Sequence, residues 1–252
     1  AVLRRVMAVD WQAPVALTLA LMPLLRASRG QIIELDSDRA GSLDGILRKA
    51  YDGTDLPVTE DDVSVAQITT RDIDRGDHPH YLMKEIGEAP TSFRKTLRGK
   101  IVEGDNGLEV KLGPEIIPTD VREGLRDGSI TRVLVIGQGT AAVAGQSLAA
   151  ALDALVPEGQ ISAEAILATE LSGFSLRSDM SDTLIVAVSQ SGTTTDTNRT
   201  VDIVRNRGAK VIAIVNRRGS DLTDRVDGVL YTSDGRDVEM SVASTKAFYS
   251  QI

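Results

Sequence analysis

The residues best suited to chemistry stand together in the stretch SQSGTT at residues 189–194. The stretch carries four hydroxyl side chains and one amide, and a helical pattern follows it. Backbone N–H groups at a helix N-terminus favour an anion, because the helix dipole places positive partial charge there. Gly192 would let the backbone approach a ligand without a side chain in the way. The stretch therefore predicts a turn that binds phosphate.

Certain residue types are missing from the same stretch. It has no Gly-Lys-Ser/Thr ending, so it is not a nucleoside-triphosphate loop. Neither a lysine nor a pair of carboxylates that would suit magnesium stands in it. A neutral set of hydroxyls and amides fits the phosphate monoester of a small molecule better than a triphosphate. The alternative is that Ser191 to Thr194 only cap the helix, since Ser and Thr are ordinary N-cap residues.

A second pattern, GQGTAA at residues 137–142, satisfies G-x-G-x-x-A after a predicted strand. Glu164 is predicted at the end of the next strand, about where a dinucleotide-binding fold places its ribose-binding acid, so a nicotinamide-dependent oxidoreductase stays open as an alternative. The pattern is weak by itself, because two glycines make any tight turn between strand and helix. Gln138 and Thr140 could equally donate to a sugar, and Glu164 is more simply explained as a surface residue.

Alternating apolar and amphipathic segments from residue 132 onward must position both patterns. They predict an α/β protein with a five-stranded parallel, doubly wound sheet of flavodoxin-like type and right-handed crossovers. In such sheets ligands bind outside the carboxyl ends of the strands. The predicted strands are 132–136, 161–166, 183–188, 210–215 and 228–231, and the predicted helices are 140–155, 167–174, 196–207, 221–226 and 242–252.

The first half of the chain carries weaker patterns. Residues 1–77 predict a smaller α+β region or linker, and residues 78–252 the domain that holds the phosphate-binding turn, with a helical segment at its start. A charged, glycine-containing stretch at 70–77 marks the boundary. Within these parts we expect strands at 31–35 and 63–68, a helix at 43–50, a loop at 54–62, a helix after Pro79 with the apolar face Tyr81, Met83 and Ile86, a break at Pro90, a second helix ending near Gly99, turns at 104–113 and a helix at 121–125.

Composition excludes several classes of protein and site. A net charge of −8 argues against a general nucleic-acid binder, because no excess of Lys and Arg would neutralise phosphates. The absence of cysteine excludes disulfides, thiolate metal sites and a cysteine nucleophile. The most apolar run, residues 13–25, is too short to span a bilayer and contains two prolines. We therefore expect a cytoplasmic protein without membrane or nucleic-acid partners, metal or cofactor.

Four ordered motifs carry a family resemblance over residues 78–252, about two-thirds of the chain. HYLMKEIGEAP at 80–90 is similar to H-(Y/F)-M-x-K-E-I-x-E-Q-P, and GQGTAA is similar to a turn that contains CGTS. SQSGTTTDT at 189–197 is similar to SQSGETADT, and VASTKAFYSQ at 242–251 to VASTKAYTSQ. These motifs resemble the first sugar isomerase (SIS) domain of the glutamine–fructose-6-phosphate aminotransferase family, the glucosamine-6-phosphate synthases.

The resemblance implies a site for fructose 6-phosphate or glucosamine 6-phosphate, in a homodimer that acts in amino-sugar biosynthesis. It implies no catalytic residue in this segment, and Lys246 does not match the family's Schiff-base lysine. Lys246 and the two histidines, His78 and His80, are expected to have surface, capping or helix-packing roles. The substrate-binding residues that the resemblance implies are Gly139, Thr140, Ser189, Gln190, Ser191, Thr194, Val242, Ala243 and Ser244.

Some positions depart from the family pattern. Ala141 replaces a sugar-binding serine, Gln138 replaces a cysteine and Thr193 replaces a glutamate. The sequence also lacks the second SIS domain, which holds the general-base glutamate, the ring-opening histidine and the C-terminal lysine, and it lacks the glutaminase cysteine. The resemblance leaves residues 1–77 as either a remnant of a glutaminase-like domain or a linker. We therefore expect this chain to bind the sugar phosphate with little or no turnover. A non-catalytic sugar-phosphate sensor is the alternative within the same fold.

Overall fold

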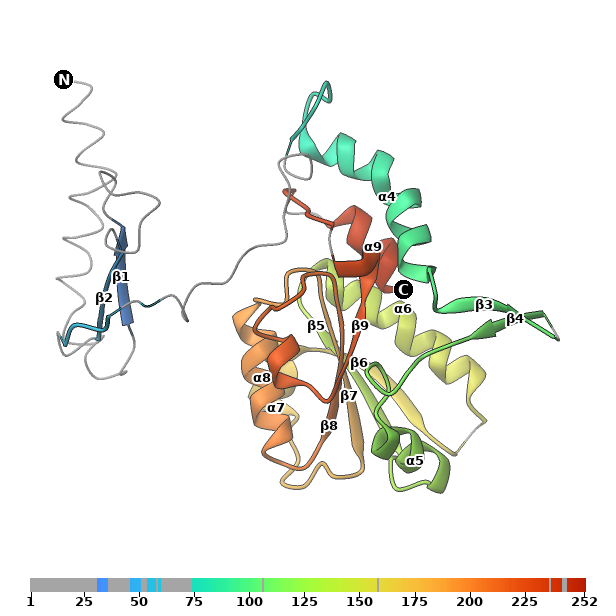
Figure 1. Cartoon of the computed structure of the whole chain (residues 1–252). Coiled ribbons are helices and arrows are strands. Elements are labelled where there is room, and N and C mark those ends of the chain that lie inside the picture. Colours follow the sequence, from blue (N-terminus) through green and yellow to red (C-terminus); the bar gives the residue numbers. More distant parts are fainter. Residues whose placement is uncertain are drawn as a thin grey trace, which may run out of the picture. The chain divides into compact units, whose positions relative to one another are not determined.

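Two units of the chain are described separately, residues 1–66 and residues 67–252. No described helix combines the length and apolar character that crossing a membrane requires. The computed structural model (Figure 1) describes residues 31–35, 46–50, 54–57, 59, 74–105, 107–157, 159–235, 237–241 and 244–252.

The first unit contains an antiparallel pair of strands, β1 (Gln31–Leu35) and β2 (Ile46–Ala50). Gln31 lies opposite Ala50 and Leu35 opposite Ile46. The predicted strand at 31–35 is confirmed, whereas the predicted helix over 43–50 is wrong. A paired strand satisfies the backbone groups of β1 as well as its own, and such pairing overrides a weak local helix preference. The predictions for residues 13–25 and 63–68 lie outside the described residues.

The second unit is built on a five-stranded parallel sheet in the order β6-β5-β7-β8-β9 (Figure 1). This is the flavodoxin-like order of a doubly wound sheet, so the predicted fold class is confirmed. The central strand β7 is buried along its whole length, which explains why its sequence is a continuous apolar run. The strands are β5 (Arg132–Gly137), β6 (Ser162–Leu167), β7 (Thr183–Ser189), β8 (Lys210–Val215) and β9 (Gly228–Tyr231).

Helices lie on both faces of the sheet (Figure 1), and an apolar cluster fills the space on each side. Because side chains alternate along a strand, Val133 and Val135 enter one cluster, and Leu134 and Ile136 enter the other. The first cluster meets α5 (Thr119–Asp127) and α6 (Thr140–Leu155), and the second meets α7 (Ala168–Phe174) and α8 (Thr195–Arg205). The sheet is therefore covered on both faces, as predicted.

Helix α4 (Tyr81–Leu97) is continuous through Pro90, so the predicted break there is wrong. Proline lacks the N–H that would bond four residues back, and it usually ends or kinks a helix. Here α4 lies against the 3₁₀ segment η6 (Thr232–Gly235) and the last helix, α9 (Thr245–Gln251), along its length. Packing against two elements keeps the helix in register across one missing hydrogen bond.

The faces of α4 are inverted relative to an ordinary surface helix. Its buried residues are Glu85, Ala89, Ser92 and Thr96, which stand three or four positions apart on one face. The apolar residues Met83, Ile86 and Phe93 are 52%, 51% and 43% exposed instead. The apolar face that the sequence predicts therefore points outward, and α4 packs on its own domain through a polar face.

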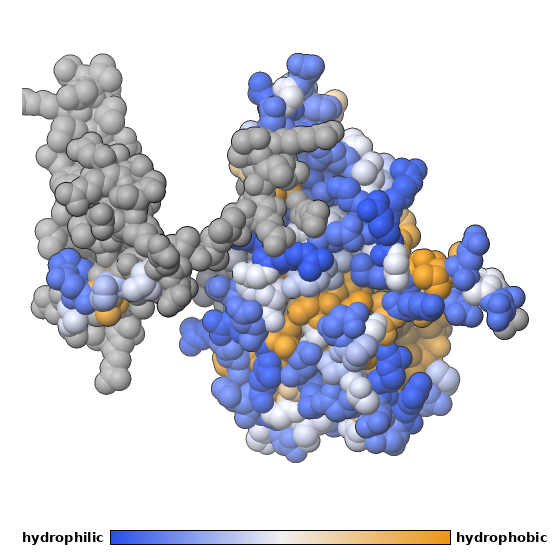
Figure 2. Space-filling view, viewed as in Figure 1, coloured by the Kyte–Doolittle hydropathy of each residue, from blue (hydrophilic) through white to orange (hydrophobic). Residues whose placement is uncertain are grey.

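A hairpin formed by β3 (Ile101–Gly104) and β4 (Gly107–Val110) follows α4 where the sequence analysis expected only turns. Its strands are four residues long each, too short for a clear alternation of apolar and polar residues. Figure 2 shows apolar surface on this hairpin, where Leu108 and Val110 are 76% and 69% exposed. A 3₁₀ turn, η5 (Thr223–Arg225), lies within the helical turn predicted at 221–226.

Candidate functional site

The two turns singled out in the sequence meet at the carboxyl end of the sheet. The chain leaves β5 toward α6 on one face and leaves β7 toward α8 on the other, although β5 and β7 are hydrogen-bonded neighbours. The turns diverge at this point, which is where doubly wound folds hold their ligands. A cavity of about 180 Å³ lies between them, lined by Gln138, Gly139, Thr140, Ala141, Val188, Ser189, Gln190, Ser191, Thr194 and Ser244.

The cavity brings together every predicted site residue that the structure describes. The turn after β5 supplies Gly139 and Thr140, the turn after β7 supplies Ser189 to Ser191 and Thr194, and the residue before α9 supplies Ser244. Val242 and Ala243 lie outside the described residues. Contact of these residues with a ligand stays a prediction, but their convergence on one cavity follows from the topology of the sheet.

Two helices begin at the cavity without a side-chain cap. The N-cap residue of α6 is Gly139, which has no side chain, and its φ of 57° is one that glycine adopts readily. The N-cap residue of α8 is Thr194, and its hydroxyl makes no capping hydrogen bond. The simple helix-cap interpretation therefore does not hold for Thr194. The first N–H groups of both helices have no intrahelical acceptor, so an anion in the cavity would satisfy them.

Hydrogen bonds within the β7–α8 turn fix its shape. The N–H of Gly192 donates to Oγ of Ser189 at 3.0 Å. The N–H and hydroxyl of Thr193 lie 3.3 and 3.0 Å from Oγ of Ser191. A serine oxygen that accepts such a bond keeps its own hydrogen as a donor. Ser189 and Ser191 can therefore shape the turn and donate to a ligand at the same time.

Gly192 has a packing role that the sequence did not predict. Its φ is +65°, and a Cβ at this position would lie 2.0 Å from Oγ of Ser220. Its carbonyl accepts from the side chain of Asn198 at 3.2 Å and from the N–H of Leu222 at 3.0 Å. Gly192 does not line the cavity. The glycine is therefore required by the turn's packing against Ser220, and its predicted role in admitting a ligand stays a prediction.

The turn is also tied to the neighbouring strand. The carbonyl of Gln190 accepts hydrogen bonds from the N–H groups of Asn216 and Arg217, each at 3.2 Å. Asn216 and Arg217 follow β8 directly. The backbone of Gln190 is thus fixed by β8, while its side chain lines the cavity.

The G-x-G-x-x-A pattern has a packing role. A Cβ at Gly137 would lie 3.0 Å from backbone atoms of Ala141 and Ala142, so glycine permits close contact between β5 and α6. The side-chain amide of Gln138 donates to the hydroxyl of Thr169 at 3.2 Å. Ala141, which stands where the related family has serine, lines the cavity with a methyl group. Ala141 therefore offers no hydroxyl to a ligand at this point of the cavity.

Glu164 is not placed where a ribose-binding acid belongs. It is the third residue of β6 and lies opposite Leu134, whereas the strand runs on to Leu167. Three residues correspond to roughly 10 Å along a strand. Its carboxylate pairs with Arg132 at 3.2 Å and its side chain is 62% exposed. The predicted position at the end of the strand is wrong, and the dinucleotide alternative loses its acidic residue.

The described residues that line the cavity include no ionisable side chain. Within the described part of the chain, no cluster of three or more His, Asp or Glu residues could hold a metal ion. His78 and His80 are exposed, as expected, and His80 precedes α4 without forming a side-chain cap. The arrangement is suited to holding a ligand by dipoles and hydrogen bonds.

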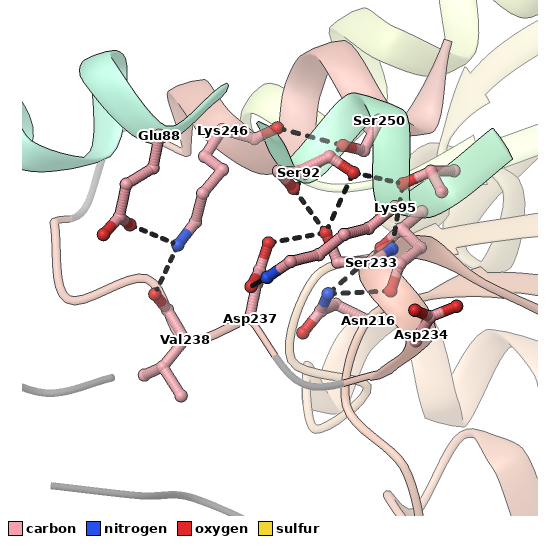
Figure 3. Close-up of polar contacts among 12 residues, drawn as sticks. Glu88, Ser92, Lys95, Asn216, Ser233, Asp234, Asp237, Val238, Lys246 and Ser250 are labelled. Carbon is pink, nitrogen blue, oxygen red and sulfur yellow. Dashed lines mark hydrogen bonds and ion pairs between the residues drawn. The ribbon is translucent and has the colours of Figure 1, made fainter. Parts of the chain in front are cut away.

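The residues around α9 form a polar network that the sequence analysis missed. Lys246, expected at the surface or in helix packing, is 4% exposed, and its Nζ lies 3.0 Å from Oε2 of Glu88 and 3.0 Å from the carbonyl of Val238 (Figure 3). Glu239 accepts from the N–H of Ala247 at 3.0 Å, inside the first turn of α9. Burial raises the pKa of the Glu239 carboxyl above its usual value. The backbone N–H groups that donate to the carboxylate lower the pKa, but by less.

The capping of α9 by Glu239 leaves Ser244 free of that task. Ser244 is the N-cap residue of α9 and makes no side-chain capping bond. Because Ser244 lines the cavity, its hydroxyl can face a ligand there. The predicted helix over 242–252 begins later than expected, at Thr245.

A family model supplies the observation that decides the family. Residues 129–252 match the SIS domain. This range includes the β5–α6 and β7–α8 turns, the five strands of the parallel sheet and α9. This chain carries a SIS domain. The recognisable β7–α8 turn and the residue before α9 both lie inside the matched SIS segment, so the motif resemblance and the family match identify the same part of the chain.

Relatives of known name agree with this SIS assignment. The chain is 34% identical over 220 residues to the glutamine–fructose-6-phosphate aminotransferase of Thermus thermophilus, covering 84% of this chain and 33% of the relative. It is 34% identical over 231 residues to the same-named enzyme of Streptomyces coelicolor, covering 87% of this chain and 33% of the relative. The chain thus spans about one third of the length of the relatives it matches.

Solved structures extend the comparison. The C-terminal domain of glucosamine–fructose-6-phosphate aminotransferase from Francisella tularensis superposes with a TM-score of 0.56 at 26% identity, covering 71% of this chain and 46% of that chain. A phosphosugar isomerase structure from Clostridium difficile gives 0.52 at 18% identity, covering 68% and 42%, and supports the fold alone. The SIS domain is therefore related to the aminotransferase family in sequence and in structure.

Proposed function

We propose that the cavity between the β5–α6 and β7–α8 turns binds a hexose 6-phosphate, either fructose 6-phosphate or glucosamine 6-phosphate. The observation that carries the proposal is the convergence of two uncapped helix N-termini with the hydroxyls of Ser189, Ser191 and Thr194 on one cavity. Such a site suits a monoester anion without help from lysine or metal. The relatives are named for fructose 6-phosphate, which supports the choice of sugar.

The phosphate is placed in the turn after β7, and the sugar extends toward Thr140 and Ser244. The β7–α8 turn offers the densest set of hydroxyl and backbone donors. Ala141 presents a methyl group on the sugar side, so the hexose receives fewer hydrogen bonds there than in the related family. We expect the phosphate to supply most of the affinity.

The role proposed for the chain is binding without proton transfer, as part of an amino-sugar-forming aminotransferase that acts in the cytoplasm as a homodimer. A non-catalytic sugar-phosphate sensor is the second candidate. It is favoured by one observation, that the described lining residues carry no group able to act as an acid or base. Glucosamine 6-phosphate formation by the purified chain would contradict both roles, since each assumes binding without turnover, and light scattering would measure the oligomeric state.

A thermal-shift titration tests the proposal. A ligand that binds only the folded state stabilises it by RT ln(1 + [L]/Kd), about 2.7 kcal/mol at a hundredfold excess over Kd. For a chain of this size that corresponds to a rise in Tm of roughly 5–10 °C. We expect this rise with fructose 6-phosphate or glucosamine 6-phosphate and none with NADH. Stabilisation by NADH alone would instead favour the oxidoreductase.

A matched pair of serine variants locates the binding. Ser191→Ala should weaken binding of the hexose phosphate about 10-fold or more, because a hydrogen bond to a charged group is lost. Ser178→Ala removes an exposed serine from the loop before β7, at the other end of that strand, and should leave the affinity unchanged. Equal affinity of both variants would show that the phosphate does not occupy the β7–α8 turn.

A further inference from the structure

Ser244 lines one side of the cavity, and this side is not positioned by the strands of the sheet. Gly139 and Ser189 stand at the ends of two strands, whereas Ser244 follows the segment Asp237–Ser241, which leads from η6 into α9. Its position therefore depends on whatever holds that segment. In the described part of the chain, polar side chains of α4 and α9 bond to this segment, and Asp237 and Glu239 of the segment bond back to the two helices.

Glu85 holds the segment from α4. Its side chain is 2% exposed, and Oε1 accepts from the N–H of Met240 at 2.5 Å and from the N–H of Ser241 at 3.2 Å. Oε2 accepts from the hydroxyl of Ser241. Three donors on one carboxylate compensate the cost of its burial, and they fix two consecutive residues of the segment.

The other side of the segment is held by α9 and by a second carboxylate of α4. Glu239 accepts from the N–H of Ala247. Lys246 donates to the carbonyl of Val238 while it pairs with Glu88 on α4 (Figure 3). The segment is thus tied at Val238 and Glu239 to α9, and at its next two residues to Glu85. No described residue of α4 lines the cavity, so any influence of Glu85 on the ligand passes through this segment.

We propose that Glu85 is a positioning residue for the hexose-phosphate site, because it sets the place of Ser244 against the sugar end of the ligand. The inference rests on the proposed function. It adds that α4, which lies outside the cavity, determines where Ser244 contacts the sugar. It also explains the inverted faces of α4. The polar face is buried because its carboxylates hold the segment before α9.

The test compares two ligands on the full chain by calorimetry. Glu85→Gln keeps the shape of the side chain but replaces one of its two acceptor oxygens with an NH2 donor and removes the charge from the other. Fructose 6-phosphate should then bind about 10-fold more weakly, whereas inorganic phosphate, held by the β7–α8 turn alone, should change by less than about twofold. Glu123→Gln, an exposed glutamate on α5, is the matched control and should change neither affinity.

A double-mutant cycle with Ser244→Ala separates positioning from general destabilisation. If Glu85 acts by placing Ser244, the double variant should bind fructose 6-phosphate within about twofold of the weaker single variant, since the two changes remove the same contact. Independent effects would multiply. Ser241→Ala, which removes one donor to Glu85 and leaves the carboxylate in place, repeats the cycle should Glu85→Gln fail to fold.

Three outcomes would overturn the inference. These are an unchanged affinity for fructose 6-phosphate in Glu85→Gln, an equal loss for inorganic phosphate, or effects that multiply in the double variant. Failure of the wild-type chain to bind either ligand would instead remove the proposed function and the inference with it. Binding by the wild type together with one of the three outcomes removes the inference alone.

Discussion

The β7–α8 turn and the wall in front of α9 border the same cavity but are held in different ways. The turn is closed by bonds within itself, such as Gly192 N–H to Ser189, three residues apart. The wall is held by Glu85, which is separated from Met240 by 155 residues in the sequence. The phosphate-binding side thus keeps its shape locally, while the sugar side depends on packing between α4 and α9.

The largest effect on stability should come from disrupting the β7–α8 turn, which is closed by hydrogen bonds within itself. Gly192→Ala places a Cβ against Ser220 at a positive φ, so both strain and overpacking oppose it. We expect a loss of about 2–4 kcal/mol in the free energy of unfolding, measured by urea denaturation. Gly173→Ala, in α7 where a Cβ meets nothing within 4 Å, should be neutral or stabilising. Equal stability of the two variants would show that the turn tolerates a side chain.

An intermediate effect is expected at Asp237, in the segment before α9 that α4 holds. There the stability of the fold should depend on pH. Burial raises the pKa of Asp237, but the Ser233 hydroxyl, the charge of Lys246 and the donors Ser92 and Lys95 outweigh it and lower the pKa below its usual value. A carboxyl with a lowered folded pKa stabilises the fold above its unfolded pKa, and this contribution is lost as pH falls through the folded value.

Asp237→Asn should therefore lose stability at neutral pH and show a shallower decline between about pH 5 and pH 3 than the wild type. Thermal unfolding across that range measures it. Asp221→Asn, at an exposed site, should retain the wild-type acid limb. An identical slope for wild type and Asp237→Asn would mean that this carboxylate does not support the wall through its charge.

The smallest effect should come from the ion pair that lies outside both regions. Glu164→Gln breaks an exposed pair with Arg132, and such pairs contribute about 0.2–1 kcal/mol. Affinity for fructose 6-phosphate should stay the same in calorimetry. A clear loss of affinity would place Glu164 in the ligand site and revive the dinucleotide interpretation.

The difference between the two regions also explains what could be predicted from the sequence. The strands and the β7–α8 turn depend on short-range patterns, such as the apolar run of β7 followed by hydroxyls, and these were found. The α4 face was missed because its buried residues, including Glu85 and Ser92, are polar and acquire partners only through contacts more than 140 residues away. Nothing local distinguishes such residues from a solvated surface.

Two other features have the same origin. Pro90 predicts a helix break by local rules, but packing against η6 and α9 keeps α4 continuous. Gly192 has a packing role that local rules do not show, because its neighbour Ser220 comes from the turn after β8. The position of Glu164 is a separate error, since the predicted strand 161–166 already runs two residues past it and β6 ends at Leu167.

A crystal structure of the chain with fructose 6-phosphate tests the central claim most directly. The phosphate should lie within hydrogen-bonding distance of the Ser191 and Thr194 hydroxyls and of the first N–H groups of α8, with the sugar toward Ser244. A phosphate bound instead in the basic groove that Arg98, Lys100, Lys111 and Arg218 line, with the β7–α8 cavity empty, would contradict the account.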